Sequence, residues 1–183
     1  MGKQFTEIRE DQIKFITNQK IFFVGTAGAE GRVNISPKGM DSLRIISKNK
    51  VIWLNLTGSG NETAAHLLEK QRITLMFCAF EGKPLILRLY GKGKLVHRRD
   101  ANWQVCSKLF PKYIGARQII EVDVDLVQKS CGFGVPFFDY KEDRDLLTKW
   151  GNAKGEEGIQ AYWVEKNRFS IDGKPTKILE ETE

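Results

Sequence analysis

Two short polar runs in this sequence could together bind an anion. The first, Val33-Asn34-Ile35-Ser36-Pro37-Lys38, ends an expected strand with a hydroxyl and an ammonium group. The second, Thr57-Gly58-Ser59-Gly60-Asn61-Glu62-Thr63, follows another strand and opens a helix. Free backbone N–H groups and the positive end of the helix dipole favour an anion at such a helix start. We therefore predict a phosphate site, although the spacing of Ser36 and Lys38 alone fits a strand that ends in a solvated lysine.

Other candidate motifs carry less weight. Gly58-Ser59-Gly60 lacks the third glycine of a dinucleotide fingerprint, and Gly91-Lys92-Gly93-Lys94 lacks Walker A spacing. Cys106 lies on the apolar face of an expected helix and is interpreted as a core residue. His66 is interpreted as a packing or surface residue, and His97, within a basic run, as solvated.

Apolar and polar residues alternate in several segments of the chain in the way that is typical of short strands, and these strands would position the candidate residues. Ile52, Leu54 and Leu56 are expected on one face of a strand, and Val51 and Trp53 on the other. Strands are expected at 20–27, 32–36, 40–47, 51–56, 72–80, 85–96 and 118–127, and helices at 6–18, 61–70, 100–109, 139–149 and 158–166. Ser59 and Glu62 match a capping box before the second helix, and Gly91 and Gly93 indicate a bulge or close backbone contact.

This order of elements predicts a mainly β fold with flanking helices. Six to seven antiparallel strands close best as a small barrel, which removes exposed edges. Alternating β-α-β units are absent from the pattern, so a Rossmann sheet is disfavoured. We expect residues 1–130 to form the barrel domain and residues 131–183 to form a loop and helical extension packed on it.

Composition narrows the class of protein. The chain has 183 residues and a net charge of +6 spread along its length, which favours solvated surface over a nucleic-acid face. Its three cysteines show no C-x-x-C spacing, and only two histidines are present, so a metal site is not expected. No apolar run has the length of a membrane span, and no signal peptide is recognised. Reduced thiols then predict a cytoplasmic protein.

Three motifs together resemble the pyridoxamine 5′-phosphate oxidase-like family of FMN-binding split β-barrels. They are the runs 36–39, 56–63 and 88–91 (Arg88-Leu89-Tyr90-Gly91). The run 131–136 and the tail 166–173 are similar to the uncharacterised oxidase-related branch of that family. The likeness covers most of the chain.

This resemblance implies a homodimer that binds FMN at the subunit interface, with a split barrel of Greek-key type. The flavin ring would lie along Val33 to Lys38. Lys38 stands where the family's oxidase has a lysine near flavin and substrate, and Thr57 stands at the phosphate end. Asn61, Glu62 and Thr63 stand where the family has a run that grips the phosphate.

Glu62 and Thr63 depart from the family pattern, because they replace two cations. Compensation for the phosphate charge is expected from Lys38, from Arg88 and from backbone N–H groups of the helix start. The expected function is an FMN-binding oxidoreductase of unknown substrate. The alternatives are a non-catalytic flavin, deazaflavin or haem binder of the same fold, or a dimeric module without a cofactor.

Overall fold

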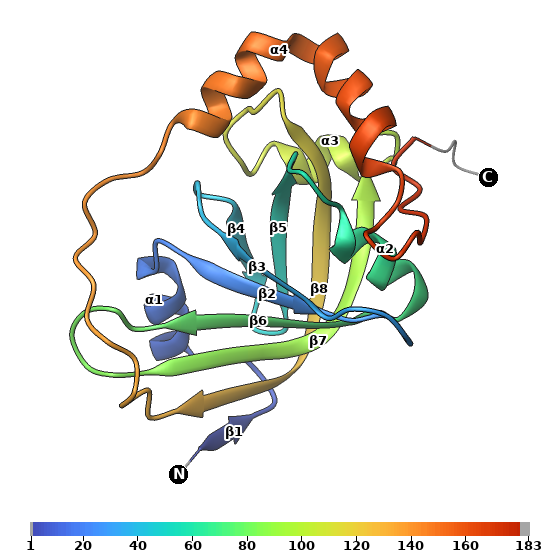
Figure 1. Cartoon of the computed structure of the whole chain (residues 1–183). Coiled ribbons are helices and arrows are strands. Elements are labelled where there is room, and N and C mark those ends of the chain that lie inside the picture. The colour runs from blue at the N-terminus through green and yellow to red at the C-terminus, as the bar shows by residue number, and fades with distance from the viewer. Residues whose placement is uncertain (1, 180–183) are drawn as a thin grey trace.

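A computed structural model describes residues 2–179 and shows eight strands in one antiparallel sheet (Figure 1). The strands run in the order β3-β2-β6-β7-β8-β5-β4, and β1 pairs with β8 beyond the end of β5. Their bounds are β1 Lys3–Phe5, β2 Phe22–Thr26, β3 Asn34–Lys38, β4 Leu43–Ser47, β5 Lys50–Leu56, β6 Arg72–Cys78, β7 Ile86–His97 and β8 Ala116–Ser130. The mainly β fold with flanking helices is confirmed.

The prediction of six to seven strands missed β1. Its three residues, Lys3 to Phe5, are mostly exposed and too few to show an alternating pattern. The strand forms because residues 127–129 of β8 extend beyond β5 and offer free backbone groups for pairing.

The long central strands β7 and β8 connect the two halves of the sheet. Along β8, residues 116–123 pair with β5, while β7 pairs along the whole opposite edge. The register shifts between Tyr90 and Gly91, which confirms the irregularity expected there. A Cβ atom built on Gly91 would lie 2.0 Å from the carbonyl oxygen of Asp123. Only glycine allows β7 and β8 to approach this closely.

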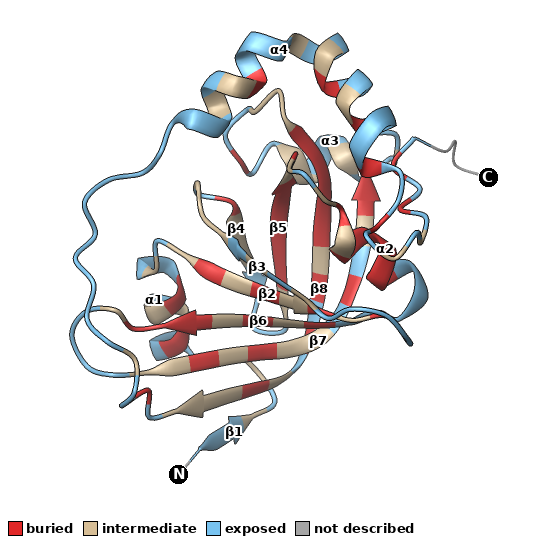
Figure 2. Ribbon diagram, in the orientation of Figure 1, coloured by how far each residue is buried: buried red, intermediate tan, exposed pale blue. Residues whose placement is uncertain are grey.

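Strand β5 separates two apolar cores, as its alternation predicts. Val51 and Trp53 are buried in the main core, which fills the inside of the curved sheet. Ile52 and Leu54 belong to a second core with Phe110. Strand β5 is buried on both faces and therefore lies deep in the molecule (Figure 2). Its packing fixes the position at which the polar loop after it begins.

The helices lie at the ends and outer faces of the sheet (Figure 1). They are α1 Glu10–Asn18, α2 Glu62–Glu69, α3 Trp103–Ser107 and α4 Leu146–Tyr162, and α4 continues as a π-helical turn, Trp163–Asn167. Between residues 2 and 179, none of the helices is both long and apolar enough to cross a lipid bilayer.

The chain after β8 differs from the two helices expected there. Residues 133–145 run extended and mostly exposed along the side of the molecule (Figure 2), and helix begins only at Leu146. From there α4 crosses one end of the sheet, with a break at Gly155, where φ is 63°. Ile159 and Trp163 pack with Ile178 in a small third core. This packing carries the C-terminal residues back toward β3 and α2.

Candidate functional site

One cavity of about 890 Å³ collects most of the residues singled out in the sequence. Its walls come from β3, from the loop between β5 and α2, from the start of β8 and from the C-terminal segment. The predicted site residues that line it are Val33, Asn34, Ser36, Pro37, Lys38, Thr57, Glu62 and Thr63. Segments far apart in the chain therefore meet at the place where the sequence predicts an anion.

Strand β3 presents alternate residues to this cavity. Asn34, Ser36 and Lys38 line it, whereas Ile35 lines a hollow on the other face of the sheet and is 70% exposed. The Lys38 ammonium lies 5.4 Å from the centre of the Trp53 ring. Burial, with the nearby Arg117 charge as a lesser cause, lowers the pKa of Lys38 to about 8.

Arg117, at the start of β8, is a cavity residue that the sequence analysis missed. Its side chain is buried, and burial lowers the pKa of the guanidinium to about 9. One Nη1–H group donates to Oδ1 of Asn167 at 2.8 Å, and Nε, which is also buried, has no hydrogen-bond partner. The predicted strand begins at Gln118, one residue after Arg117, whereas β8 begins at Ala116. A charged residue adjoining an apolar strand was the only signal available.

Four basic side chains line the cavity, and two of them, Lys38 and Arg117, have no carboxylate partner in the described part of the chain. The other two, Arg32 and Lys166, pair with Asp172 and Glu165. Within residues 2–179, no Asp or Glu oxygen lies within 4.0 Å of the charged nitrogens of Lys38 or Arg117. Like charges facing one cavity raise the free energy of the empty site, and an anion placed between them would lower it.

The Thr57 hydroxyl is already engaged within the protein. It donates to the Gly115 carbonyl at 2.7 Å and accepts a hydrogen bond from the Trp163 indole at 2.8 Å. Its only proton is therefore used. In this arrangement Thr57 shapes the cavity wall, and it links the loop after β5 to the end of α4.

The residues at the start of α2 have different environments. Asn61 is buried outside the cavity lining and donates to the Asn167 carbonyl at 3.4 Å. Thr63 accepts a hydrogen bond from the Asn34 amide at 3.3 Å. The expected capping box is wrong: α2 begins at Glu62, and the Glu62 carboxylate accepts the Ile171 N–H at 3.0 Å. The tail of the chain, not the helix, holds that carboxylate.

Arg88 lies elsewhere. It lines the hollow of about 550 Å³ on the other face of the sheet, together with Ile35, Met76 and Tyr90. Its guanidinium is 3.4 Å from the Ser130 hydroxyl. Within this chain the structure therefore does not bring Arg88 to the cavity of Lys38, and the cation that accompanies Lys38 without a carboxylate partner is Arg117.

Neither histidine lines the cavity. His66 is buried and shares a hydrogen bond of 3.0 Å with the Thr26 hydroxyl, in agreement with a packing role. His97 is 7% exposed, so its predicted solvation is wrong, because it ends a strand that lies deeper than its basic neighbours suggest. In the part of the chain that is described, no three His, Cys, Asp or Glu side chains gather as metal ligands.

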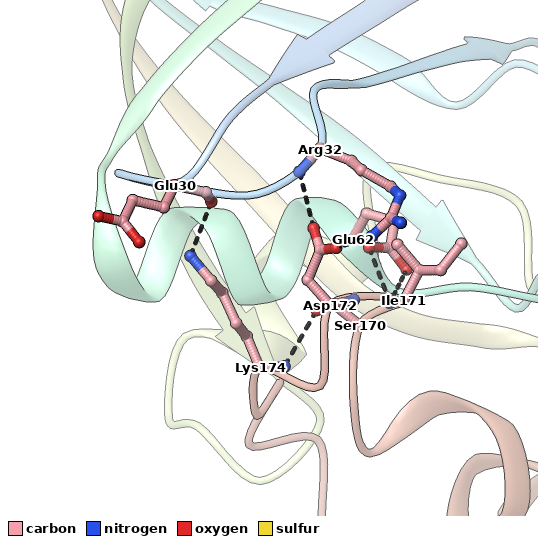
Figure 3. Close-up of polar contacts among 7 residues, drawn as sticks. All are labelled: Glu30, Arg32, Glu62, Ser170, Ile171, Asp172 and Lys174. Atoms are coloured by element: carbon pink, nitrogen blue, oxygen red, sulfur yellow. Dashed lines mark hydrogen bonds and ion pairs between the residues drawn. The ribbon is translucent and has the colours of Figure 1, made fainter.

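A short turn near the C-terminus, residues 168–176, closes one side of the cavity, and we call it the strap. Figure 3 shows how it is fastened to the loop before β3. Asp172 accepts the Arg32 backbone N–H at 2.7 Å and also pairs with the Arg32 guanidinium. Lys174 donates to the Glu30 carbonyl at 3.0 Å. Polar contacts on both sides of the turn hold it against the cavity.

Comparison with known proteins identifies a family model and a relative that match this chain. A family model described as pyridoxamine 5′-phosphate oxidase matches residues 8–131. The pyridoxamine 5′-phosphate oxidase family protein ustO of Aspergillus flavus is 35% identical over 190 residues, which cover 93% of this chain and 76% of that protein.

Solved structures show the same fold at low sequence identity. The crystal structure of HupZ from Group A Streptococcus superposes with a TM-score of 0.53 at 20% identity, covering 65% of this chain and 91% of that one. A proposed pyridoxamine 5′-phosphate oxidase from Lactobacillus delbrueckii gives a TM-score of 0.51 at 16% identity, covering 67% of this chain and 94% of that one. With the sheet order, the matched residues and the ustO likeness in agreement, this chain is a split-barrel protein that belongs to the pyridoxamine 5′-phosphate oxidase family.

Proposed function

We propose that the cavity binds the flavin nucleotide FMN and that the protein is a flavin-dependent oxidoreductase whose substrate is a small molecule. The observation that carries this proposal is the pair Lys38 and Arg117, two cations that line one cavity and that form no ion pair with a carboxylate within residues 2–179. A doubly charged phosphate ester would satisfy both, and charge-assisted hydrogen bonds are the strong ones.

The size and lining of the cavity fit a nucleotide with a flat ring. Its volume, about 890 Å³, is within the roughly 300–1,000 Å³ usual for small-molecule sites. Arg117 and Lys38 would hold the phosphate, with Ser36 and Asn34 as further polar partners. Apolar side chains for the ring are also present, among them Val33 and the C-terminal Phe169.

When bound, FMN would supply reversible transfer of a hydride or of single electrons. The chain would bind and orient it. Lys38 would stabilise negative charge on the ligand, and the strap would limit the access of water. Glu62 is compatible with this arrangement, because its carboxylate is turned to the Ile171 N–H and is stabilised by that hydrogen bond.

The lining disfavours haem among the alternatives. Within residues 2–179, no histidine or cysteine contributes to the cavity, and Met40 is the one side chain there of a type that ligates haem iron. A non-catalytic flavin carrier would use the same residues as an enzyme. Oxidation of reduced nicotinamide by the FMN-loaded protein would distinguish the enzyme from the carrier.

We further propose that the protein is a homodimer and that the second copy covers the outer face of β3 and β6. Val33 and Ile35 are each 70% exposed there, and they border the hollow that holds Arg88. Isolated exposed aliphatic residues are common, but these two adjoin an apolar hollow. Sedimentation is expected to give twice the chain mass of 20.9 kDa, and Ile35→Lys is expected to give the single-chain mass. A parent protein that sediments as a monomer contradicts the proposal.

The FMN affinity should fall as the pH rises above about 8. The free protein loses the Lys38 proton near that pH, whereas a bound phosphate raises the pKa of Lys38 and keeps the proton on. The complex therefore holds more protons than the free protein above pH 8, and affinity decreases there by up to about tenfold per pH unit. Below about pH 7, where Lys38 is charged in both states, this dependence disappears. Quenching of FMN fluorescence between pH 6 and pH 10 measures the effect.

Two variants make this titration decisive. Lys38→Met should bind FMN at least about tenfold more weakly at pH 7. It should also lose the part of the decrease that begins near pH 8, so that its affinity falls only near pH 9, where Arg117 loses its proton. Lys14→Met removes an exposed lysine of α1 and should match the parent at every pH. A parent protein that does not bind FMN at all overturns the proposed function.

A further inference from the structure

The C-terminal segment contributes to the cavity although it lies outside the matched family region. The family model ends at residue 131, yet Lys166, Phe169 and Ile171 line the cavity. The two crystal structures compared above cover only 65% and 67% of this chain. The walls that the segment supplies therefore lie outside the residues that the family model matches.

Asn167, the last residue of the π-helical turn, connects this segment to the cavity. It is completely buried. Its Oδ1 atom accepts from Arg117 at 2.8 Å, and its Nδ2–H group donates to the Gly58 carbonyl at 3.0 Å. Its backbone carbonyl accepts from the Thr176 hydroxyl at 2.6 Å. Its side chain thus links β8 to the loop after β5, and its backbone carbonyl links both to the strap.

The contact with Arg117 fixes the direction of that guanidinium. An arginine side chain has several rotatable bonds and loses considerable freedom when it is held in one geometry. In residues 2–179, Asn167 is the one group that accepts a hydrogen bond from Arg117, and no carboxylate pairs with it. A neutral amide holds the guanidinium without cancelling its charge. That combination suits an arginine whose charge is needed by a ligand.

We propose that Asn167 is a positioning residue for phosphate recognition: it orients Arg117 toward the ligand phosphate and couples that arginine to the strap. This inference rests on the proposed FMN site. It assigns to the C-terminal segment a role in ligand selection, because groups with a phosphate would gain from the oriented arginine and groups without one would not.

The test compares FMN with riboflavin, which has the same ring system but no phosphate. Asn167→Asp places a carboxylate against Arg117 and neutralises it. The charged and titratable groups around this position are Arg117 on β8, Glu62 on α2 and Tyr162 on α4, with Lys38 on β3 also near Arg117. FMN affinity at pH 7.5 is expected to fall at least about thirtyfold, while riboflavin affinity changes by less than about threefold.

Two further variants separate positioning from folding. Asn167→Ser removes the contact with Arg117 without adding a charge, and should weaken FMN binding less than Asn167→Asp does. Thr176→Val removes the hydrogen bond to the Asn167 backbone and leaves the Arg117 contact in place. It should lower the melting temperature but keep the ratio of FMN to riboflavin affinity. Melting temperatures of all variants are recorded alongside.

Each outcome has a distinct meaning. If Asn167→Asp and Asn167→Ser lower FMN and riboflavin affinity by equal factors, or leave both unchanged, Asn167 has only a structural role and the inference is wrong while the FMN site stands. If the parent binds neither ligand, the proposed function itself falls, and the role of Asn167 with it.

Discussion

Arg117→Met is expected to weaken FMN binding at least about 100-fold while the free protein keeps its stability. The loss corresponds to about 2.7 kcal/mol, which is typical for removing a charged partner from a buried phosphate contact. The free protein tolerates the change because the buried guanidinium has no carboxylate partner and is costly to desolvate. Removing the guanidinium therefore saves its desolvation cost. The Asn167 acceptor, left without a hydrogen bond, offsets part of that saving by about 1–3 kcal/mol. Weaker binding without a loss of stability distinguishes a ligand-binding arginine from a structural one.

FMN titration and thermal unfolding of the same preparations measure both quantities. Arg144→Met is the matched control, since Arg144 lies in the exposed run before α4. It removes the same charge and should leave FMN affinity and melting temperature at parental values. If Arg117→Met binds FMN within threefold of the parent, or unfolds many degrees earlier, the assigned role of Arg117 is wrong.

Gly91→Ala is expected to destabilise the fold by at least about 3 kcal/mol or to prevent folding. The new Cβ atom would lie 2.0 Å from the carbonyl oxygen of Asp123 and 2.9 Å from its carbonyl carbon. Both are backbone atoms of the adjacent strand, so no side chain can rotate away. β7 and β8 would have to separate at the register shift where the sheet bends, and losses of this size arise from such backbone conflicts.

Gly25→Ala, on strand β2, provides the comparison. The nearest atom to its added Cβ is the Thr74 carbonyl oxygen at 3.9 Å, which is an ordinary contact. Its free energy of unfolding should stay within about 1 kcal/mol of the parent. Urea unfolding of the two variants decides the matter, and equal stabilities would show that the close approach at Gly91 does not limit the fold.

Most of the sheet could be predicted because its strands carry local signals. The alternation along β5 reports two buried faces, and the burial of Trp53 and Ile52 on opposite sides confirms it. The glycine at position 91 likewise predicted the irregularity that the structure shows there. β1 could not be found, because its three residues, Lys3 to Phe5, are too few to show an alternating pattern. The start of α4 was placed too early, since an exposed charged run resembles the polar face of a helix.

The site was predictable only where its residues are close in sequence. Ser36 and Lys38 share a strand, and alternation places them on one face. Arg117 and Asn167 meet across 50 positions of sequence, and neither has a local pattern that indicates a partner. Arg88 belongs to a run that resembles a family motif, but the motif does not determine which face of the sheet the side chain occupies. The structure places Arg88 in the other hollow.

The most direct measurement is the crystal structure of the protein grown with FMN. We expect flavin in the cavity between β3, the β5–α2 loop and the strap, with phosphate oxygens about 2.7–3.2 Å from the Arg117 guanidinium and the Lys38 ammonium. A phosphate bound away from both cations, or crystals at saturating FMN that contain no flavin, would contradict it.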